Sequence, residues 1–148
     1  MGDISPGAEH HRKLERLYLS APTNIYYRPQ ISVCEGRARI SLMVREDFFH
    51  AASAVHGAVC FKLLDDAAFF AVNSTIEDVF VLTTSFYVTF LRPVSSGRLV
   101  ARGKLVHASR RLFLGESEAW NDEGKLIARG SGTFMRSHIR LGPKLGYA

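Results

Sequence analysis

Two adjacent carboxylates, Asp65 and Asp66, lie in a segment that is otherwise almost entirely apolar, residues 56–70. A segment of helical length that is apolar on nearly every side belongs in a protein core. An unpaired carboxylate in such a place costs roughly several kcal/mol before its pKa shifts. At least one of the two acids therefore has a structural partner or a chemical task.

A His-Gly pair, His56-Gly57, stands where this helix should begin. The backbone N–H groups at a helix N-terminus have no partner within the helix and point outward, which makes them an anion site. An acid along the helix and an anion site at its start are the parts that acyl transfer needs. A structural alternative stays open, in which Gly57 only permits the tight entry into the helix.

Lys62 distinguishes the two acids. Lys62 and Asp66 are spaced i,i+4, so they can form an ion pair on one side of the helix. Asp65 points elsewhere, because successive residues diverge by about 100° around a helix. Asp65 is therefore the acid without a partner nearby in the sequence.

The composition is that of an ordinary globular domain. With 148 residues, of which 47% are hydrophobic and 22% charged, we expect a single domain over 1–148. No apolar run approaches the roughly 20 residues that span a bilayer, and the polar start of the sequence lacks the apolar stretch of a signal peptide. The two cysteines, Cys34 and Cys60, are not clustered, which predicts reduced thiols, no metal site and a cytoplasmic protein.

The net charge of +5 is concentrated in the last third of the chain. From Arg98 to the end there are ten Lys/Arg residues against four Asp/Glu residues. This imbalance favours an anionic partner, either nucleic acid or a phosphorylated small molecule, although a solvated basic face of a sheet explains it equally well.

The pattern of apolar residues predicts the elements that position these groups. An amphipathic helix is expected over 8–20 and a turn to 24, then a half-buried alternating strand, a loop over 46–55 and the apolar helix, which should stop near Asn73. The expected strands cover 34–45, 81–91, 98–107, 111–120 and 125–136, and the tail 137–148 is expected to be irregular. A long apolar helix followed by an antiparallel meander predicts an α+β fold, with the sheet wrapped around the helix.

Four motifs together resemble a known family. They are V-H-G-A-V-x5-D-D-A-A from Val55, T-T-S-F-x-V-x-F-L-R-P from Thr83, G-x-L-x-A-x-G from Gly97 and D-E-G-K-L-I-A-R-G-S-G-T-F from Asp122. In order and spacing they resemble the hotdog-fold acyl-CoA thioesterases of the PaaI-like, phenylacetate-pathway group, over roughly residues 35–136. The resemblance implies a hotdog fold and the hydrolysis of a small or medium acyl-CoA thioester by water. It implies no metal and no cofactor, since coenzyme A is part of the substrate.

The resemblance also implies roles on the helix. The Gly57 N–H would contact the thioester oxygen with His56 beside it, and Ala58 takes the place of the second glycine of the family's His-Gly-Gly motif. The catalytic carboxylate, nine residues after the motif histidine, falls on Asp65, with Asp66 as its rival. Asp65 would act as general base for water or as nucleophile, and the two roles stay open.

Two further positions come from the same resemblance. The strand hydroxyl that serves the carboxylate or the water falls on Thr83, with Thr84 as the alternative, although threonine also simply suits a strand. Six residues before His56, where many relatives carry Asn or Gln, this chain has His50. His50 can donate a hydrogen bond, act as a base near neutral pH, or be only a surface residue.

Coenzyme A gives the basic third of the chain a candidate partner, because arginine suits phosphate geometry. The link Ser109-Arg110-Arg111 resembles the segment that contacts the phosphate–pantetheine arm in relatives, and Arg129 and Arg136 are weaker candidates. The resemblance implies homodimers, with Gly57 facing Asp65 of the partner subunit, that commonly pair into homotetramers.

Two rival functions remain at the level of the sequence. A non-catalytic acyl-CoA or acyl-carrier-binding hotdog protein is favoured by the departure at His50. Nucleic-acid binding would rest on charge alone, because the expected strands lack an aromatic ladder that stacks bases. We therefore expect neither a nucleic acid nor a membrane as partner.

Overall fold

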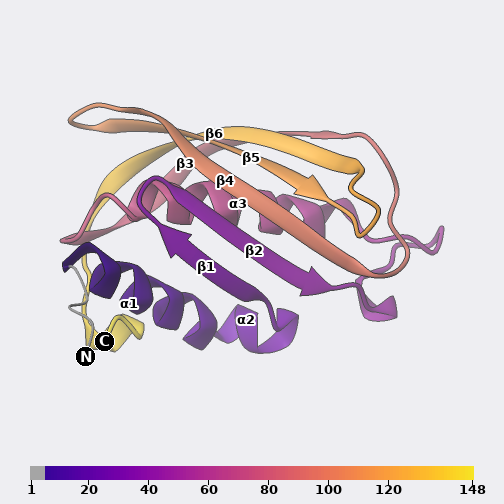
Figure 1. Cartoon of the computed structure of the whole chain (residues 1–148), viewed down its shortest axis with the longest axis horizontal. Coiled ribbons are helices and arrows are strands. Elements are labelled where there is room, and N and C mark those ends of the chain that lie inside the picture. Colours follow the sequence, from indigo (N-terminus) through magenta and orange to yellow (C-terminus); the bar gives the residue numbers. More distant parts are fainter. Residues whose placement is uncertain (1–5) are drawn as a thin grey trace.

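Helix α3 (Gly57–Asn73) lies against one face of a six-stranded antiparallel sheet in the computed structural model of the chain (Figure 1). The structure describes residues 6–148. The strands follow the order β1-β2-β4-β5-β6-β3, so that β1 and β3 form the two edges. Their bounds are Gln30–Cys34 (β1), Arg37–Met43 (β2), Val79–Phe90 (β3), Arg98–Ala108 (β4), Leu112–Trp120 (β5) and Leu126–Arg140 (β6). The expected α+β hotdog fold, a long central helix wrapped by a curved antiparallel sheet, is confirmed.

Helix α3 forms the centre of the core because apolar side chains cover most of its circumference. Leu63, Ala67 and Ala68 are fully buried, and neither glycine nor proline interrupts the helix after its first residue. The sheet comes closest at Gly103, where a β-carbon would lie 2.1 Å from the carbonyl oxygen of Ala67. Only a glycine there lets strand and helix approach in this way. No helix within residues 6–148 is long and apolar enough to cross a membrane.

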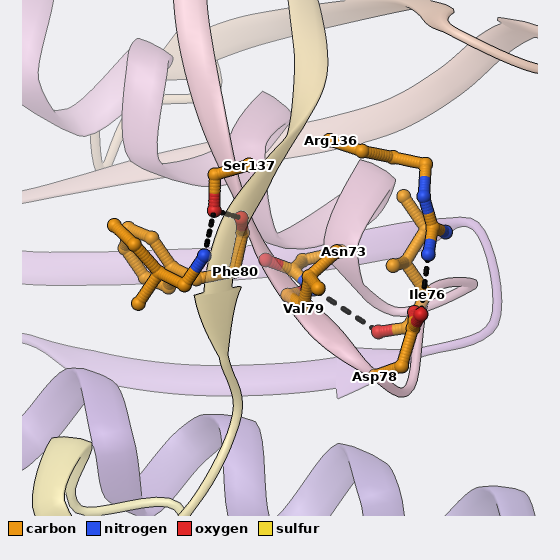
Figure 2. A network of polar contacts seen from close by, with 8 residues as sticks. Asn73, Ile76, Asp78, Val79, Phe80, Arg136 and Ser137 are labelled. Carbon is orange, nitrogen blue, oxygen red and sulfur yellow. Dashed lines mark hydrogen bonds and ion pairs between the residues drawn. The ribbon is translucent and has the colours of Figure 1, made fainter.

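Asn73, the last residue of α3, fastens the helix to the beginning of β3 (Figure 2). Its side-chain amide donates to the carbonyl oxygens of Ile76 and Val79, each at 3.1 Å. Its Oδ1 accepts the N–H of Val81 at 3.0 Å. Because Asn73 is completely buried, these bonds replace the water that its amide and the backbone would otherwise need.

Side chains of strand β6 also bind residues at the beginning of β3 and just before it (Figure 2). The Ser137 hydroxyl donates to the carbonyl oxygen of Phe80, and Arg136 forms an ion pair with Asp78. Residues 137–140, which the sequence assigns to an irregular tail, are therefore part of β6, whose last residue, Arg140, pairs with Val79. The expectation for the tail was wrong over these residues because a polar, charged run carries no apolar alternation to mark a strand.

The N-terminal part of the described chain consists of two helices, α1 (Pro6–Ser20) and α2 (Pro22–Tyr27), next to β1 (Figure 1). The sequence predicts only a turn over 21–24, whereas the chain forms a second short helix there. Proline suits the first position of a helix, because its missing N–H would be unpaired there anyway. Of the region 1–24 expected to hold the N-terminal helix and turn, the first five residues lie outside the described residues.

The predicted strand over 34–45 is in fact one arm of a hairpin. Strand β1 ends at Cys34, and β2 begins at Arg37 after a turn in which Gly36 has φ +71°. The sequence leaves a strand or a hairpin open at this place, because β1, with only five residues, is too short for an alternating pattern to mark it. The alternation predicted for β2 is correct, since Ala38 and Ile40 are buried against the core.

Strand β3 is a long edge strand that leaves apolar side chains uncovered. Leu82, Tyr87 and Phe90 are 46%, 74% and 56% exposed. One side of β3 pairs with β6, and within residues 6–148 no strand pairs with its other side. Such an edge is a template for pairing with another chain.

Candidate active site

The start of α3 presents a free backbone donor. The side chain of His56 caps the helix, with its Nδ1 accepting the N–H of Ala58 at 2.9 Å. The N–H of Gly57 is paired with no acceptor among residues 6–148. His56 therefore satisfies one N–H of the first turn and leaves that of Gly57 available, at the positive end of the helix dipole.

The loop before the helix brings His50 to the same end. Its Nδ1 accepts the N–H of Ala52 at 3.0 Å, and its ring centroid lies 6.4 Å from that of His56. His50 and Gly57 line an open cavity of about 450 Å³ together with Phe90 and Pro93. The Phe90 ring lies so close that a β-carbon at Gly57 would be 3.1 Å from its Cζ.

Asp65 lies further along α3, partly buried, with a hydrogen bond from β3. The Thr83 hydroxyl donates to its Oδ1 at 2.9 Å. Burial raises the pKa of Asp65 to about 6, helped by the charge of Asp66, while the Thr83 hydrogen bond and Lys62 act in the opposite direction. A carboxyl group with such a pKa can accept and release a proton near neutral pH.

Asp66 is engaged in a structural network. Its Oδ2 accepts from the Lys62 ammonium at 2.6 Å and from the Tyr18 hydroxyl at 2.8 Å. The Lys62 ammonium also lies over the Tyr18 and Tyr27 rings, 5.3 and 5.2 Å from their centroids. Burial, together with the adjacent carboxylate, raises the pKa of Tyr18, which keeps its hydroxyl a donor. The i,i+4 ion pair expected from the sequence is present, and Asp65 lies outside it.

A β-bulge explains why Thr83, and not Thr84, contacts Asp65. The pairing of β3 with β6 shifts between Thr83 and Ser85. Thr83 pairs with Phe134, whose side chain is buried beneath the sheet, while the Thr84 hydroxyl lies 2.6 Å from that of Thr133. Ser85 also contacts the Thr133 hydroxyl, so the bulge places the successive side chains of Thr84 and Ser85 on the outer face and leaves Thr83 on the face of α3.

Within one chain the structure does not bring all these groups together. Gly57 and Asp65 are eight residues apart on one helix, which separates them by about 12 Å along its axis. Gly57 and His50 border one cavity, whereas Asp65 and Thr83 border another. The chain therefore carries two half-sites, a donor end at Gly57 and a carboxylate at Asp65.

The arginines proposed from the sequence lie apart from both half-sites. Ser109 closes the β4–β5 turn, because its hydroxyl donates to the Leu112 carbonyl at 2.8 Å and accepts the Leu112 N–H at 3.1 Å. Arg110 and Arg111 are exposed at the tip of this turn. Arg136 is occupied by its ion pair, and Arg129 lies opposite Glu118 in the neighbouring strand.

One residue at the site, Tyr18, and the capping contact of another, His56, were not predicted from the sequence patterns. Tyr18 supplies the second partner of Asp66 from 48 residues away, a distance that no local pattern reveals. His56 caps the helix through its ring nitrogen, although the side chains usually sought at this position are Ser, Thr, Asp and Asn. The His-Gly pair in the sequence was the signal from which this capping contact could have been predicted.

Comparisons with known proteins identify the family of the chain. Residues 52–128, a little more than half of the chain, match the family model of the thioesterase superfamily. A protein of Archaeoglobus fulgidus named "Putative esterase" is 31% identical over 103 residues, which cover 69% of this chain and 66% of that protein. This chain thus matches about two thirds of the length of that relative.

Solved structures are similar over most of the fold. The PaaI protein of the phenylacetic acid degradation operon of E. coli aligns with a TM-score of 0.83 at 22% identity, covering 92% of this chain and 99% of that one. A mutant of the phenylacetic acid degradation protein PaaI from Thermus thermophilus aligns with a TM-score of 0.72 at 27% identity, covering 79% of this chain and 100% of that one. The likeness to the E. coli protein is one of fold.

Proposed function

This chain belongs to the thioesterase superfamily, and from that membership we propose that it hydrolyses a small or medium acyl-CoA thioester to the free acid and coenzyme A. The observation that carries the proposal is the carboxyl group of Asp65. It is partly buried, hydrogen-bonded by Thr83 and has a pKa of about 6, as a proton acceptor near neutral pH requires.

In the proposed reaction, Asp65 takes a proton from water as the water oxygen attacks the thioester carbon. The C–S bond then breaks, and the thiolate of coenzyme A leaves and takes up a proton. In the alternative, an Asp65 oxygen attacks the carbon directly, the C–S bond breaks, and the thiolate of coenzyme A leaves and takes up a proton. Water then hydrolyses the resulting anhydride, which releases the free acid and restores the Asp65 carboxylate. In both routes the Thr83 hydroxyl holds the carboxylate in place through its hydrogen bond.

Negative charge develops on the thioester oxygen in both routes. The Gly57 N–H, which has no acceptor within residues 6–148, is suited to stabilise it, because a fixed donor at a helix N-terminus needs no reorganisation during the reaction. His50 borders the same cavity and would donate to the substrate through its Nε2–H, because its Nδ1 already accepts the N–H of Ala52.

We further propose that the site is completed between two copies of the chain. The separation of Gly57 from Asp65 along α3 and the free edge of β3 both support this assembly. Antiparallel pairing of two β3 edges would extend the sheet and place the donor end of one subunit opposite Asp65 of the partner subunit. Such dimers would in turn pair into tetramers, and Arg110 and Arg111 would meet the phosphates of coenzyme A.

Release of free thiol from a panel of aliphatic and aromatic acyl-CoAs tests the proposed activity. Asp65→Asn should lower kcat by about 10²- to 10⁴-fold, the range for removing a general acid–base group. Asp66→Asn is the matched control and should retain far more activity, since Asp66 is held by Lys62 and Tyr18.

Two outcomes would decide against the proposal. Undiminished hydrolysis by Asp65→Asn would remove Asp65 from the mechanism. A wild-type protein that binds acyl-CoAs, by calorimetry, but hydrolyses none of them would be a binding protein instead.

A further inference from the structure

The half-site at Asp65 opens into an apolar groove. A cavity of about 270 Å³ is lined by Asp65 and Thr83 together with Leu17, Ala21 and Phe80, and the Lys62–Asp66 pair also borders it. A second cavity of about 570 Å³ shares Leu17, Ala21 and Phe80 with the first. The two are therefore neighbouring parts of one groove, which we call the acyl groove.

Aromatic rings on α3 and β3 form its floor and one wall. Phe69 of α3 lines the first cavity, and its ring centroid lies 4.9 Å from that of Phe80. The backbone at Phe80 is held on both sides, because Asn73 bonds to Val79 and to Val81. The Ser137 hydroxyl also donates to the carbonyl oxygen of Phe80 (Figure 2).

The far end of the acyl groove is bordered by the segment 144–146. After β6 the chain turns back to lie beside α1 (Figure 1), and Leu145 and Gly146 line the second cavity. A β-carbon at Gly146 would lie 2.2 Å from the Ser20 hydroxyl, and Gly146 has φ +82°, so glycine alone fits this close approach to α1.

Two contacts of the residues after this segment hold it against α1. The Tyr147 hydroxyl lies 2.7 Å from Nδ1 of the buried His10, and Arg16 donates to the carbonyl oxygen of Ala148. The other ring nitrogen of His10 lies 3.0 Å from the carbonyl oxygen of Asn73. The segment is therefore tied through His10 to the end of α3.

We propose that the acyl groove holds an unbranched alkyl chain of the substrate and that the segment 144–146 limits its length. The inference rests on the proposed function, whose substrate class it specifies. A thioester carbon next to Asp65 places the acyl chain at the mouth of the groove. The groove then continues past Phe80 toward Leu145, a course that suits an extended chain better than a single ring.

The lining chemistry favours an apolar occupant. Leu17, Ile139 and Leu145 line the far part, and each methylene that is buried there should raise the affinity about fourfold. Lys144 also borders this part, where its methylene stem can cover apolar surface while its ammonium reaches water. Affinity should therefore rise with chain length until the chain meets Leu145.

The test compares kcat/KM for a series from acetyl-CoA to dodecanoyl-CoA, with phenylacetyl-CoA included. Ala21→Phe fills the middle of the groove and should lower kcat/KM at least about tenfold for the longer chains, since a pocket discriminates by about 10- to 200-fold per methylene. Acetyl-CoA should be spared, which shows that the variant is folded. Leu145→Ala should move the optimum to longer chains.

Ile25→Phe is the matched control, because Ile25 is 68% exposed on α2 and borders neither cavity. It should leave the chain-length profile as in the wild type. An unchanged profile in both groove variants, or a preference for phenylacetyl-CoA over every alkyl chain, would overturn the inference.

Failure of the proposed function can be distinguished from failure of this inference. If the wild type hydrolyses no thioester, the proposed function is wrong, and affinities for the same series, measured by calorimetry, then test the acyl groove by itself. An affinity that rises with chain length and loses this dependence in Ala21→Phe would support the groove, and an affinity independent of chain length would refute it.

Discussion

Asp65 and Asp66 are the same residue type with opposite surroundings. Asp66 has a cation and a phenol on one of its oxygens, whereas Asp65 has a single hydroxyl and an apolar groove. Desolvation is the main cause of the raised pKa of Asp65. A carboxylate whose charged form is destabilised by burial is a better proton acceptor than one stabilised by an ion pair.

The pH dependence of kcat/KM should follow Asp65. Activity should rise with pH through about 6, as the carboxyl group loses its proton. The Thr83 hydrogen bond stabilises the charged form and lowers the pKa, so Thr83→Val should raise it and move the acidic limb to higher pH. Thr84→Val should leave the limb in place, because Thr84 contacts Thr133 instead. A limb that stays fixed in Thr83→Val would contradict this assignment.

The N–H of Gly57 can be removed with little change in shape. Proline is tolerated at the first position of a helix, and the φ −61° and ψ 140° of His56 are the values that a residue before proline adopts. Gly57→Pro should therefore lower kcat by about 10²- to 10³-fold, as the loss of one oxyanion donor does.

Gly57→Ala is the control for this change, because it adds a β-carbon near Phe90 but keeps the N–H. Its loss of kcat should be much smaller. Equal losses in the two variants would mean that contact with Phe90, not the donor, matters.

At the residue scale, the Lys62–Asp66 pair predicted from the sequence is confirmed, because helical spacing acts over a few residues. The roles of Gly57 and Asp65, which come from the motif, stay predictions. The sequence left Thr83 and Thr84 undecided, since their difference is created by a bulge, which depends on pairing with β6. Tyr18 could not be predicted, because only the folded chain brings α1 to Asp66.

At the scale of elements, the junction between α3 and β3 determines where Thr83 and Phe80 lie. Asn73→Ala should lower the free energy of unfolding by about 3 kcal/mol or more, because it leaves two buried carbonyls and one N–H without partners. Chemical denaturation measures the loss.

The same substitution at an exposed turn provides the comparison. Asn121 accepts the N–H groups of Glu123 and Lys125 in the β5–β6 turn, where water can replace it. Asn121→Ala should therefore cost about 1 kcal/mol or less. Similar losses at both positions would show that Asn73 is not the fastening residue.

The long elements were predictable because their patterns are long. Helix α3 ends at Asn73 as expected, and β4 begins at Arg98 as expected. The hairpin arm β1 and helix α2 have only five and six residues, too few for periodicity to distinguish them from loops. The end of β6 is held by Ser137 and Arg136 rather than by an apolar pattern.

At the scale of the whole molecule, the two half-sites can be tested by mixing subunits. Gly57→Pro and Asp65→Asn each inactivate one half, so either variant alone should be nearly inactive. A mixed dimer retains one complete site, with the intact Gly57 of one subunit facing the intact Asp65 of the other. After unfolding and refolding equal amounts together, about a quarter of wild-type activity should return, because half of the dimers are mixed and each has one of two sites.

A site contained within one chain predicts a different result. Neither variant would then have an intact site, and the mixture would stay as inactive as its parts. Refolding each variant alone is the control for the procedure.

The exposed edge of β3 also bears on how the chain folds. Its 12 residues include neither a charge nor a proline, the features with which proteins usually protect such edges. In a newly folded monomer, pairing of this edge with one partner subunit therefore competes with aggregation, in which further strands add to the edge. The bulge at Thr84, which tilts two hydroxyl groups to the outer face, interrupts the flat strand at mid-length and so disfavours aggregation.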